Sequence, residues 1–230
     1  MSASSIRARV RAELTGEIKA IARRHLATDG GNLSLRAVAR DLGMVSSAVY
    51  RYFPSRDALL TALIVDAYEA LGAAAEAADA ALSRTDLRGR WLAVGHSVRS
   101  WSLSHPAEYA LLYGSPVPGY AAPTETVPPG QRVTLALVRI VLDGARTGRL
   151  TPPAGSAPPP AVRADLERLV RRYGGGLPAD DLARALAGWS QLFGLVSFEV
   201  FGRIGQVVEE PGAYFEHQLR LTADLAGLPG

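Results

Sequence analysis

The sequence predicts an all-α protein in which a small N-terminal three-helix domain is joined by a long helix to a larger helical domain. Apolar residues recur every three to four positions along most of the 230-residue chain, as they do on amphipathic helices. Three short helical patterns lie within residues 33–60, and longer patterns follow. Prolines and glycines gather between the patterns, where they would end helices rather than interrupt them.

Composition narrows the class of protein. Hydrophobic residues make up 48% of the chain, enough for a sizeable core, but no unbroken apolar run reaches the roughly 18 residues of a membrane span. The N-terminus lacks the apolar stretch of a secretory signal, and the chain has no cysteine. We therefore expect a cytoplasmic protein without disulfides or thiolate metal sites.

Positive charge concentrates at the N-terminal end. Residues 1–57 hold ten Lys and Arg against five Asp and Glu, a net charge of +5, whereas residues 58–230 hold fifteen against seventeen. A basic segment of this kind is what phosphate binding requires. That these residues are arginine rather than lysine is not evidence for bidentate recognition, because 24 Arg against a single Lys is typical of a GC-rich genome.

The first helix is expected at about residues 11–27, after a polar arm over residues 2–11 that could either continue into this helix or be disordered. The arm carries three arginines at alternate positions: Arg7, Arg9 and Arg11. It could contact phosphates or a minor groove, or it could be a solvated terminus, since basic arms occur in both settings. Turn-forming residues at positions 29–32 would end the helix.

A helix-turn-helix pattern follows. Its first helix has apolar residues at i, i+3, i+4 and i+7: Leu35, Val38, Ala39 and Leu42. Ser34 is a suitable N-cap, and Gly43 would supply the positive φ of a sharp turn. A second short helix is expected at residues 46–53, with Val49 and Phe53 inward, and it could enter a DNA major groove. The alternative is three packed helices of an ordinary bundle.

These residues resemble the DNA-binding domain of the TetR family of bacterial repressors over about residues 10–65. The segments that carry the resemblance are LRAVA at 35–39, LG at 42–43, VYRYF at 49–53 and RDALL at 56–60. The chain departs from the family pattern at Val45, where a Ser or Thr usually caps the recognition helix. Because valine cannot cap, we expect Ser46 to do so one residue later.

The resemblance implies a DNA-binding domain at residues 1–57 and a ligand-binding and dimerisation domain at residues 58–230. The helix expected from residue 56 to about residue 81 would link them, because a displacement at its far end would move the recognition helix. The alternative is a rigid connector.

Eight residues are candidates for DNA contact: Arg36, Ser46, Ser47, Ala48, Tyr50, Arg51, Tyr52 and Arg56. We expect Ser46, Ser47 and Arg51 to reach base edges. The other arginines and the tyrosines of the set are expected to bind phosphates.

Further helices are expected at residues 87–105, 107–113, 131–147, 162–173, 178–204 and 209–226. Residues 114–130 are too rich in Pro and Gly for regular structure, and such a loop could line or cover a pocket entrance. The helix at 178–204 is apolar nearly all round and needs cover on several sides. A homodimer through 178–204 and 209–226 would supply that cover, and the TetR family dimerises this way.

A small-molecule effector is the second partner that the resemblance implies. The candidate ligand-binding residues are Trp101, His105, Tyr109, Tyr113, Trp189 and Phe193. Pockets are mostly apolar with a few polar groups, although these aromatic residues could equally fill the core. Trp189 and the Phe193-Gly194 pair also resemble the C-terminal domain of a TetR subgroup marked by a Trp followed by a His-Gly or Phe-Gly pair.

An enzyme is not expected. The four histidines lack zinc-binding spacing, and no nucleophile elbow or phosphate-binding loop occurs, so neither a metal nor a cofactor is indicated. His96 beside Ser97, or His105 near Glu108, could be drawn as catalytic pairs, but any helical protein has such pairs by chance.

The sequence thus predicts a TetR-type repressor that binds a palindromic double-stranded DNA operator as a homodimer and is released by a small molecule. Two rival classes stay open. An activator or architectural DNA-binding protein would respond to no ligand. A helical enzyme or interaction module would show no salt-dependent DNA binding, and the basic N-terminal segment disfavours it.

Overall fold

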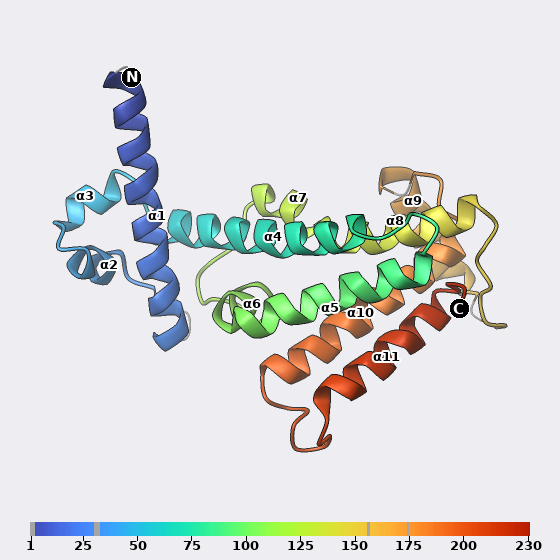
Figure 1. Ribbon diagram of the computed structural model, residues 1–230. Coiled ribbons are helices and arrows are strands. Elements are labelled where there is room, and N and C mark those ends of the chain that lie inside the picture. The colour runs from blue at the N-terminus through green and yellow to red at the C-terminus, as the bar shows by residue number, and fades with distance from the viewer. Residues whose placement is uncertain (1–2, 30–32, 156, 174) are drawn as a thin grey trace. The chain divides into compact units, whose positions relative to one another are not determined.

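The computed structural model describes residues 3–29, 33–155, 157–173 and 175–230, and within these ranges it contains eleven α-helices, one 3-10 turn and no strand (Figure 1). The predicted all-α class is therefore confirmed. The turn expected at residues 29–32 lies mostly outside the described residues.

The chain divides into two compact units, here called the N-terminal and the C-terminal unit. The N-terminal unit comprises residues 1–69 and 105–129, and the C-terminal unit comprises residues 70–104 and 130–230. The functional boundary expected at residue 57 is a different division and stays a prediction.

The N-terminal unit is built from helices of very different length around a shared core. Its elements are α1 (Ala3–Asp29), α2 (Leu35–Asp41), α3 (Ser46–Tyr50), the first part of α4 (Arg56–Ala80), α6 (Pro106–Tyr113), a 3-10 turn (Thr124–Thr126) and α7 (Val127–Gly130). Ile18, Val38 and Val49 are fully buried in that core, which the first turns of α4 complete with Leu59 and Leu60. The packing brings α1, α2 and α3 around the start of α4 (Figure 1).

The helix ends follow local chemistry, with one correction. The Ser34 hydroxyl accepts the Ala37 amide at 3.4 Å, and Gly43 has a φ of +65°, both as predicted. The expectation that Ser46 caps the next helix is wrong. Val45 is the N-cap without a side-chain hydrogen bond, because its extended backbone already directs its carbonyl to the Ala48 amide at 2.9 Å.

Three other segments differ from the ranges expected from the sequence. Helix α1 begins at Ala3, so the N-terminal arm is helical from that residue on, and α3 ends at Tyr50 rather than near residue 53. The segment 114–130 is not wholly irregular, since it contains the 3-10 turn and α7. Part of it packs on the N-terminal core through Val117 and Tyr120.

The C-terminal unit contains the end of α4, α5 (Leu87–Ser104), α8 (Arg132–Arg146), α9 (Pro160–Tyr173), α10 (Ala179–Val200) and α11 (Pro211–Leu225). Helix α10 is its centre, in contact with α5, α8, α9 and α11. Trp91 of α5 is 1% exposed, and its indole N–H donates to the Thr222 hydroxyl of α11 at 2.8 Å. Gly188 of α10 lies against the same ring.

A buried ion network joins α4, α5 and α8. The Arg90 side chain is 0% exposed, and it donates to Asp79 at 2.7 Å and to Asp143 at 2.8 Å. Burying these charges is tolerated because each is paired and hydrogen-bonded.

Helix α4 is long and apolar enough, by length and composition alone, to cross a membrane. Half of its most apolar window is buried inside the protein, as in a core helix, so this is weak evidence for a span.

The close approach of α10 to Trp91 gives a stability prediction. A Cβ at Gly188 would lie 2.5 Å from the Trp91 ring, so Gly188→Ala should destabilise the unit by about 1–3 kcal/mol through overpacking. A Cβ at Gly194 on the same helix would have nothing within 4 Å, so Gly194→Ala should instead stabilise the unit by about 0.5–1 kcal/mol.

Urea unfolding followed by tryptophan fluorescence measures both effects, because all three tryptophans lie in the C-terminal unit. Equal unfolding midpoints for the two variants would contradict the packing described.

Candidate DNA-binding surface and ligand cavity

Helix α3 presents a polar face to solvent. Val49 is fully buried and Ala48 is 7% exposed, which turns Ser47, Tyr50 and Arg51 outward. Ser46 is half-buried at the first turn. The exposed groups are hydroxyls and a guanidinium, which can bind phosphates and base edges. Ala48 offers little surface for contact with a base or a phosphate.

Three predicted residues meet around one hollow beside α3. The hollow has a volume of about 440 Å³, and its lining includes Arg36, Tyr50 and Arg56 with Ser34 and Ser55. Helices α2 and α4 both begin at this place, and their first amide groups add partial positive charge. Two guanidinium groups, hydroxyls and helix N-termini around a hollow form a suitable seat for a DNA phosphate.

Arg56 also links the start of α4 to two other segments of the N-terminal unit. Its Nε donates to the Leu33 carbonyl at 3.2 Å, and its Nη1 donates to the Pro118 carbonyl at 3.5 Å. These bonds fix the start of α4 against Leu33, which precedes the N-cap of α2, and against the loop that follows α6. Sequence reasoning missed this role, because Leu33 and Pro118 are far from Arg56 along the chain and no motif marks either carbonyl.

The N-terminal arm reaches the C-terminal end of α3 through Arg11. The Arg11 guanidinium lies 5.3 Å from the centre of the Tyr52 ring, and its Nη2 donates to the Arg51 carbonyl at 3.4 Å. Tyr52 is half-buried beneath it. Arg7 and Arg9 are exposed on the first turns of α1. Through Arg11, the positively charged surface of the arm therefore adjoins the polar face of α3.

The predicted ligand-binding residues divide between the two units. Tyr109 is fully buried and Tyr113 half-buried in the N-terminal unit, with ring centres 5.0 Å apart, and burial raises the pKa of the Tyr113 hydroxyl. His105 is exposed in the same unit. Trp101, Trp189 and Phe193 belong to the C-terminal unit, where the last two rings lie 5.8 Å apart.

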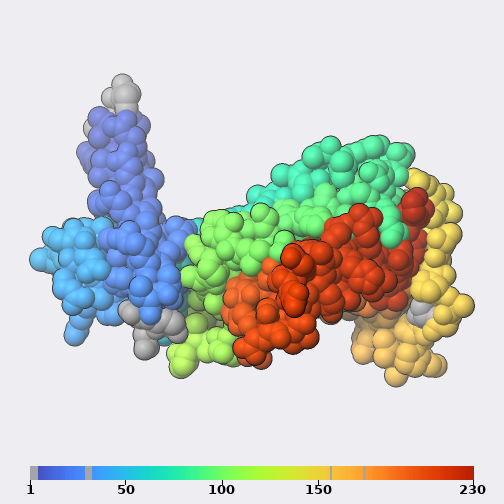
Figure 2. Space-filling view, turned by 60° about the horizontal axis from the view of Figure 1, so that its bottom comes forward, coloured from blue at the N-terminus to red at the C-terminus, as the bar shows by residue number. Residues whose placement is uncertain are grey.

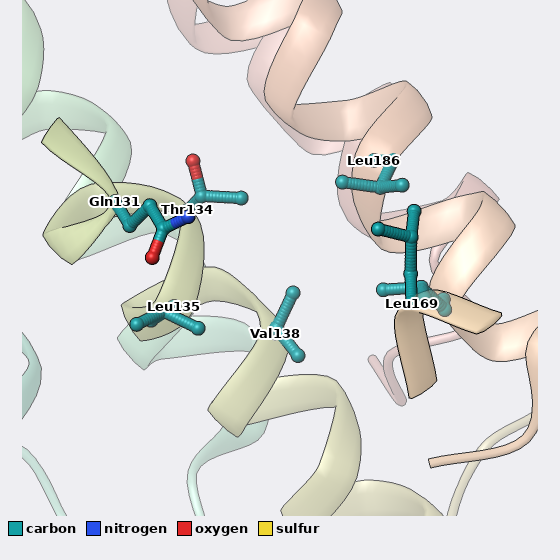
Figure 3. A pocket seen from close by; sticks show the side chains of 7 residues that line it. Gln131, Thr134, Leu135, Val138, Leu169 and Leu186 are labelled. Carbon is teal, nitrogen blue, oxygen red and sulfur yellow. The ribbon is translucent and has the colours of Figure 1, made fainter. Parts of the chain in front are cut away.

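A different set of residues lines an apolar cavity of about 170 Å³ in the C-terminal unit: Gln131, Thr134, Leu135, Val138, Leu169, Leu182 and Leu186. Residues of α8 and the turn before it face leucines of α9 and α10 across the space (Figure 3). Gln131 and Thr134 are the polar groups of the lining. No predicted ligand residue is among them, because the sequence does not distinguish a leucine that lines a cavity from one that fills a core.

Comparison with known proteins agrees with this architecture. The family description "Bacterial regulatory proteins, tetR family" matches residues 18–63, and "Tetracyclin repressor-like, C-terminal domain" matches residues 91–222. The chain belongs to the TetR family of transcriptional regulators.

Individual TetR-family relatives align along nearly the whole chain. The HTH-type transcriptional regulators Mb1846 of Mycobacterium bovis and Rv1816 of Mycobacterium tuberculosis are each 41% identical over 92% of this chain and 91% of their own length. The crystal structure of the regulatory protein SCO4313 is 33% identical, with a TM-score of 0.78 over 93% of this chain and 97% of that one.

The geometry of α3 predicts two distinct effects on DNA binding. Tyr50→Phe removes a hydroxyl from the hollow lined by Arg36, Tyr50 and Arg56, so if a phosphate sits there, binding should weaken about equally for all sequences. Ser47→Ala removes a hydroxyl from the outward face, so it should change which bases are preferred. Selection from a random DNA library with wild type and each variant measures both. An unchanged base preference for Ser47→Ala would refute its role in base reading.

Proposed function

We propose that this TetR-family regulator is a repressor that binds a palindromic operator as a homodimer and leaves it when a small molecule binds. The observation that carries the proposal is the polar face of α3 beside the hollow of Arg36, Tyr50 and Arg56. The N-terminal segment also carries the excess of positive charge. The protein would act in the cytoplasm, without catalysis and without a cofactor.

The proposed contacts follow from position. Arg36, Tyr50 and Arg56 would hold phosphates at the hollow. Tyr52 would contact a phosphate beside Arg11, whose guanidinium lies over its ring. Ser46, Ser47 and Arg51 would face the bases, because α3 exposes its leading turn and its C-cap. The phosphate contacts set the register on the duplex, and the base contacts set the sequence.

The homodimer is proposed to form through α10 and α11. Phe198 is 52% exposed near the end of α10, and Leu221 is 45% exposed on α11. Figure 2 shows α11, in red, open at the surface of the C-terminal unit. Covering these side chains with a second copy would remove apolar area from water, and in the dimer two recognition helices could read half-sites about 34 Å apart.

Placing a charge on this apolar face should prevent dimerisation. In Phe198→Glu, two carboxylates would be desolvated in each dimer, so the variant should be monomeric and bind the operator weakly. Val162→Glu is a matched control, since Val162 is 45% exposed on α9. Analytical ultracentrifugation measures both. A wild-type protein that stays monomeric, or a Phe198→Glu variant that stays dimeric, would count against this interface.

The effector is proposed to occupy the cavity between α8, α9 and α10. Its apolar walls and its two polar groups, Gln131 and Thr134, suit a small, mostly apolar molecule with one or two hydrogen-bonding groups. Release from DNA requires that the molecule bind the non-binding conformer more tightly, because that difference in affinity is all it contributes.

Filling the cavity should uncouple DNA binding from release. Leu186→Trp places an indole in the space, so it should keep operator affinity and lose the response to ligand. Val162→Trp adds the same indole outside the cavity and should respond normally. Operator binding by fluorescence anisotropy, screened against single-ring phenols, measures the response. A compound that releases both variants equally would place the effector elsewhere, and no active compound would favour a regulator without a ligand.

A further inference from the structure

Four arginines line a hollow on the C-terminal unit that the proposed functions do not use. Its volume is about 660 Å³, and the arginines are Arg84, Arg139, Arg146 and Arg149. Arg84 lies in the turn between α4 and α5, whereas the other three belong to the second half of α8 and the segment after it. The apolar cavity instead uses residues 131–138 at the other end of α8, so the two sites are separate.

The carboxylates at the hollow are already engaged. Asp143 is the acidic residue of its lining, and it accepts a hydrogen bond from the fully buried Arg90 at 2.8 Å. Asp79 lies behind the lining, where it accepts bonds from both Arg90 and Arg84. The two aspartates therefore neutralise the buried arginine and partly neutralise Arg84. Arg139 is also attracted by the Glu76 carboxylate, which is already paired with Arg132, so the positive charge at the hollow is only partly compensated.

Hydrogen bonds to carbonyl groups orient two of these arginines without cancelling their charge. Arg146 donates to the Gly175 carbonyl at 3.2 Å, and Arg149 donates to the Thr85 carbonyl at 2.5 Å. The side chains are thereby held at the rim with N–H groups to spare, since a guanidinium has five donors. Like charges gathered around one concave surface repel each other, and a bound anion relieves that repulsion.

We propose that this hollow binds an organic anion that carries two or more phosphate or carboxylate groups. Arginine forks bind both groups through paired hydrogen bonds, and several around one hollow favour a ligand with more than one negative group. Leu142, which is half-buried, supplies apolar surface in the lining, and this suits a ligand with an apolar or aromatic body. The proposal is independent of the operator and of the apolar cavity.

Calorimetric titration of the full-length protein at about 0.15 M salt tests the site, with ATP, pyrophosphate and citrate as probes. The three probes distinguish phosphate from carboxylate and show whether an aromatic body matters. We expect saturable binding of at least one probe to a site in each chain. Arg139→Gln/Arg146→Gln should weaken that binding about tenfold or more, because each charged hydrogen bond contributes strongly.

A matched control distinguishes binding at the hollow from non-specific attraction of anions to any positively charged surface. Arg168→Gln/Arg171→Gln removes the same charge from two exposed arginines of α9 outside the hollow and outside the proposed dimer interface, and it should leave binding unchanged. Circular dichroism checks that both double variants stay helical. The proposal is overturned if no probe binds below about 1 mM, or if the two double variants bind equally well. Binding to the arginines of the N-terminal unit would give that second result.

Discussion

The burial of Val49 is the constraint on which the DNA-binding surface depends. Helix α3 has five residues and no side-chain cap, and a helix of that length is not stable in water by itself. It exists because Val49 is 0% exposed and Phe53 is 6% exposed in the N-terminal core. Burying one such side chain contributes about 1.5–3 kcal/mol of stability, which helps to offset the unfavourable free energy of forming so short a helix. The same burial fixes which residues point outward.

Polar contacts tie together the helices of the N-terminal unit whose core α3 packs on. Asp66 of α4 accepts hydrogen bonds from both Lys19 and Arg23 of α1 at 2.8 Å, which ties the two longest helices of the N-terminal unit together. The Thr61 and Tyr120 hydroxyls lie 2.9 Å apart, so the loop after α6 is bonded to α4 as well. The proposed DNA contacts therefore lie on a unit whose helices are held rigidly together, as precise recognition requires.

Local signals in the sequence were sufficient for much of this structure. The period of three to four residues located the helices, and Ser34 and Gly43 marked the ends of α2, because caps and sharp turns depend on a few neighbouring residues. The N-cap of α3 was misjudged, since Val45 takes that position with an extended backbone and without a side-chain hydrogen bond. The contact between Thr61 and Tyr120 spans 59 positions, and no periodicity reports such a pairing. The cavity and the arginine hollow escaped prediction for the same reason.

Binding of the full-length protein to DNA from upstream of its own gene, measured at several salt concentrations, tests the central claim most directly. Regulators of this type often control neighbouring genes or themselves. The account predicts tight, sequence-selective binding whose affinity falls steeply as salt rises, because phosphate contacts release counterions. Absence of binding even at low salt would contradict the assignment of the α3 face and its phosphate hollow to DNA.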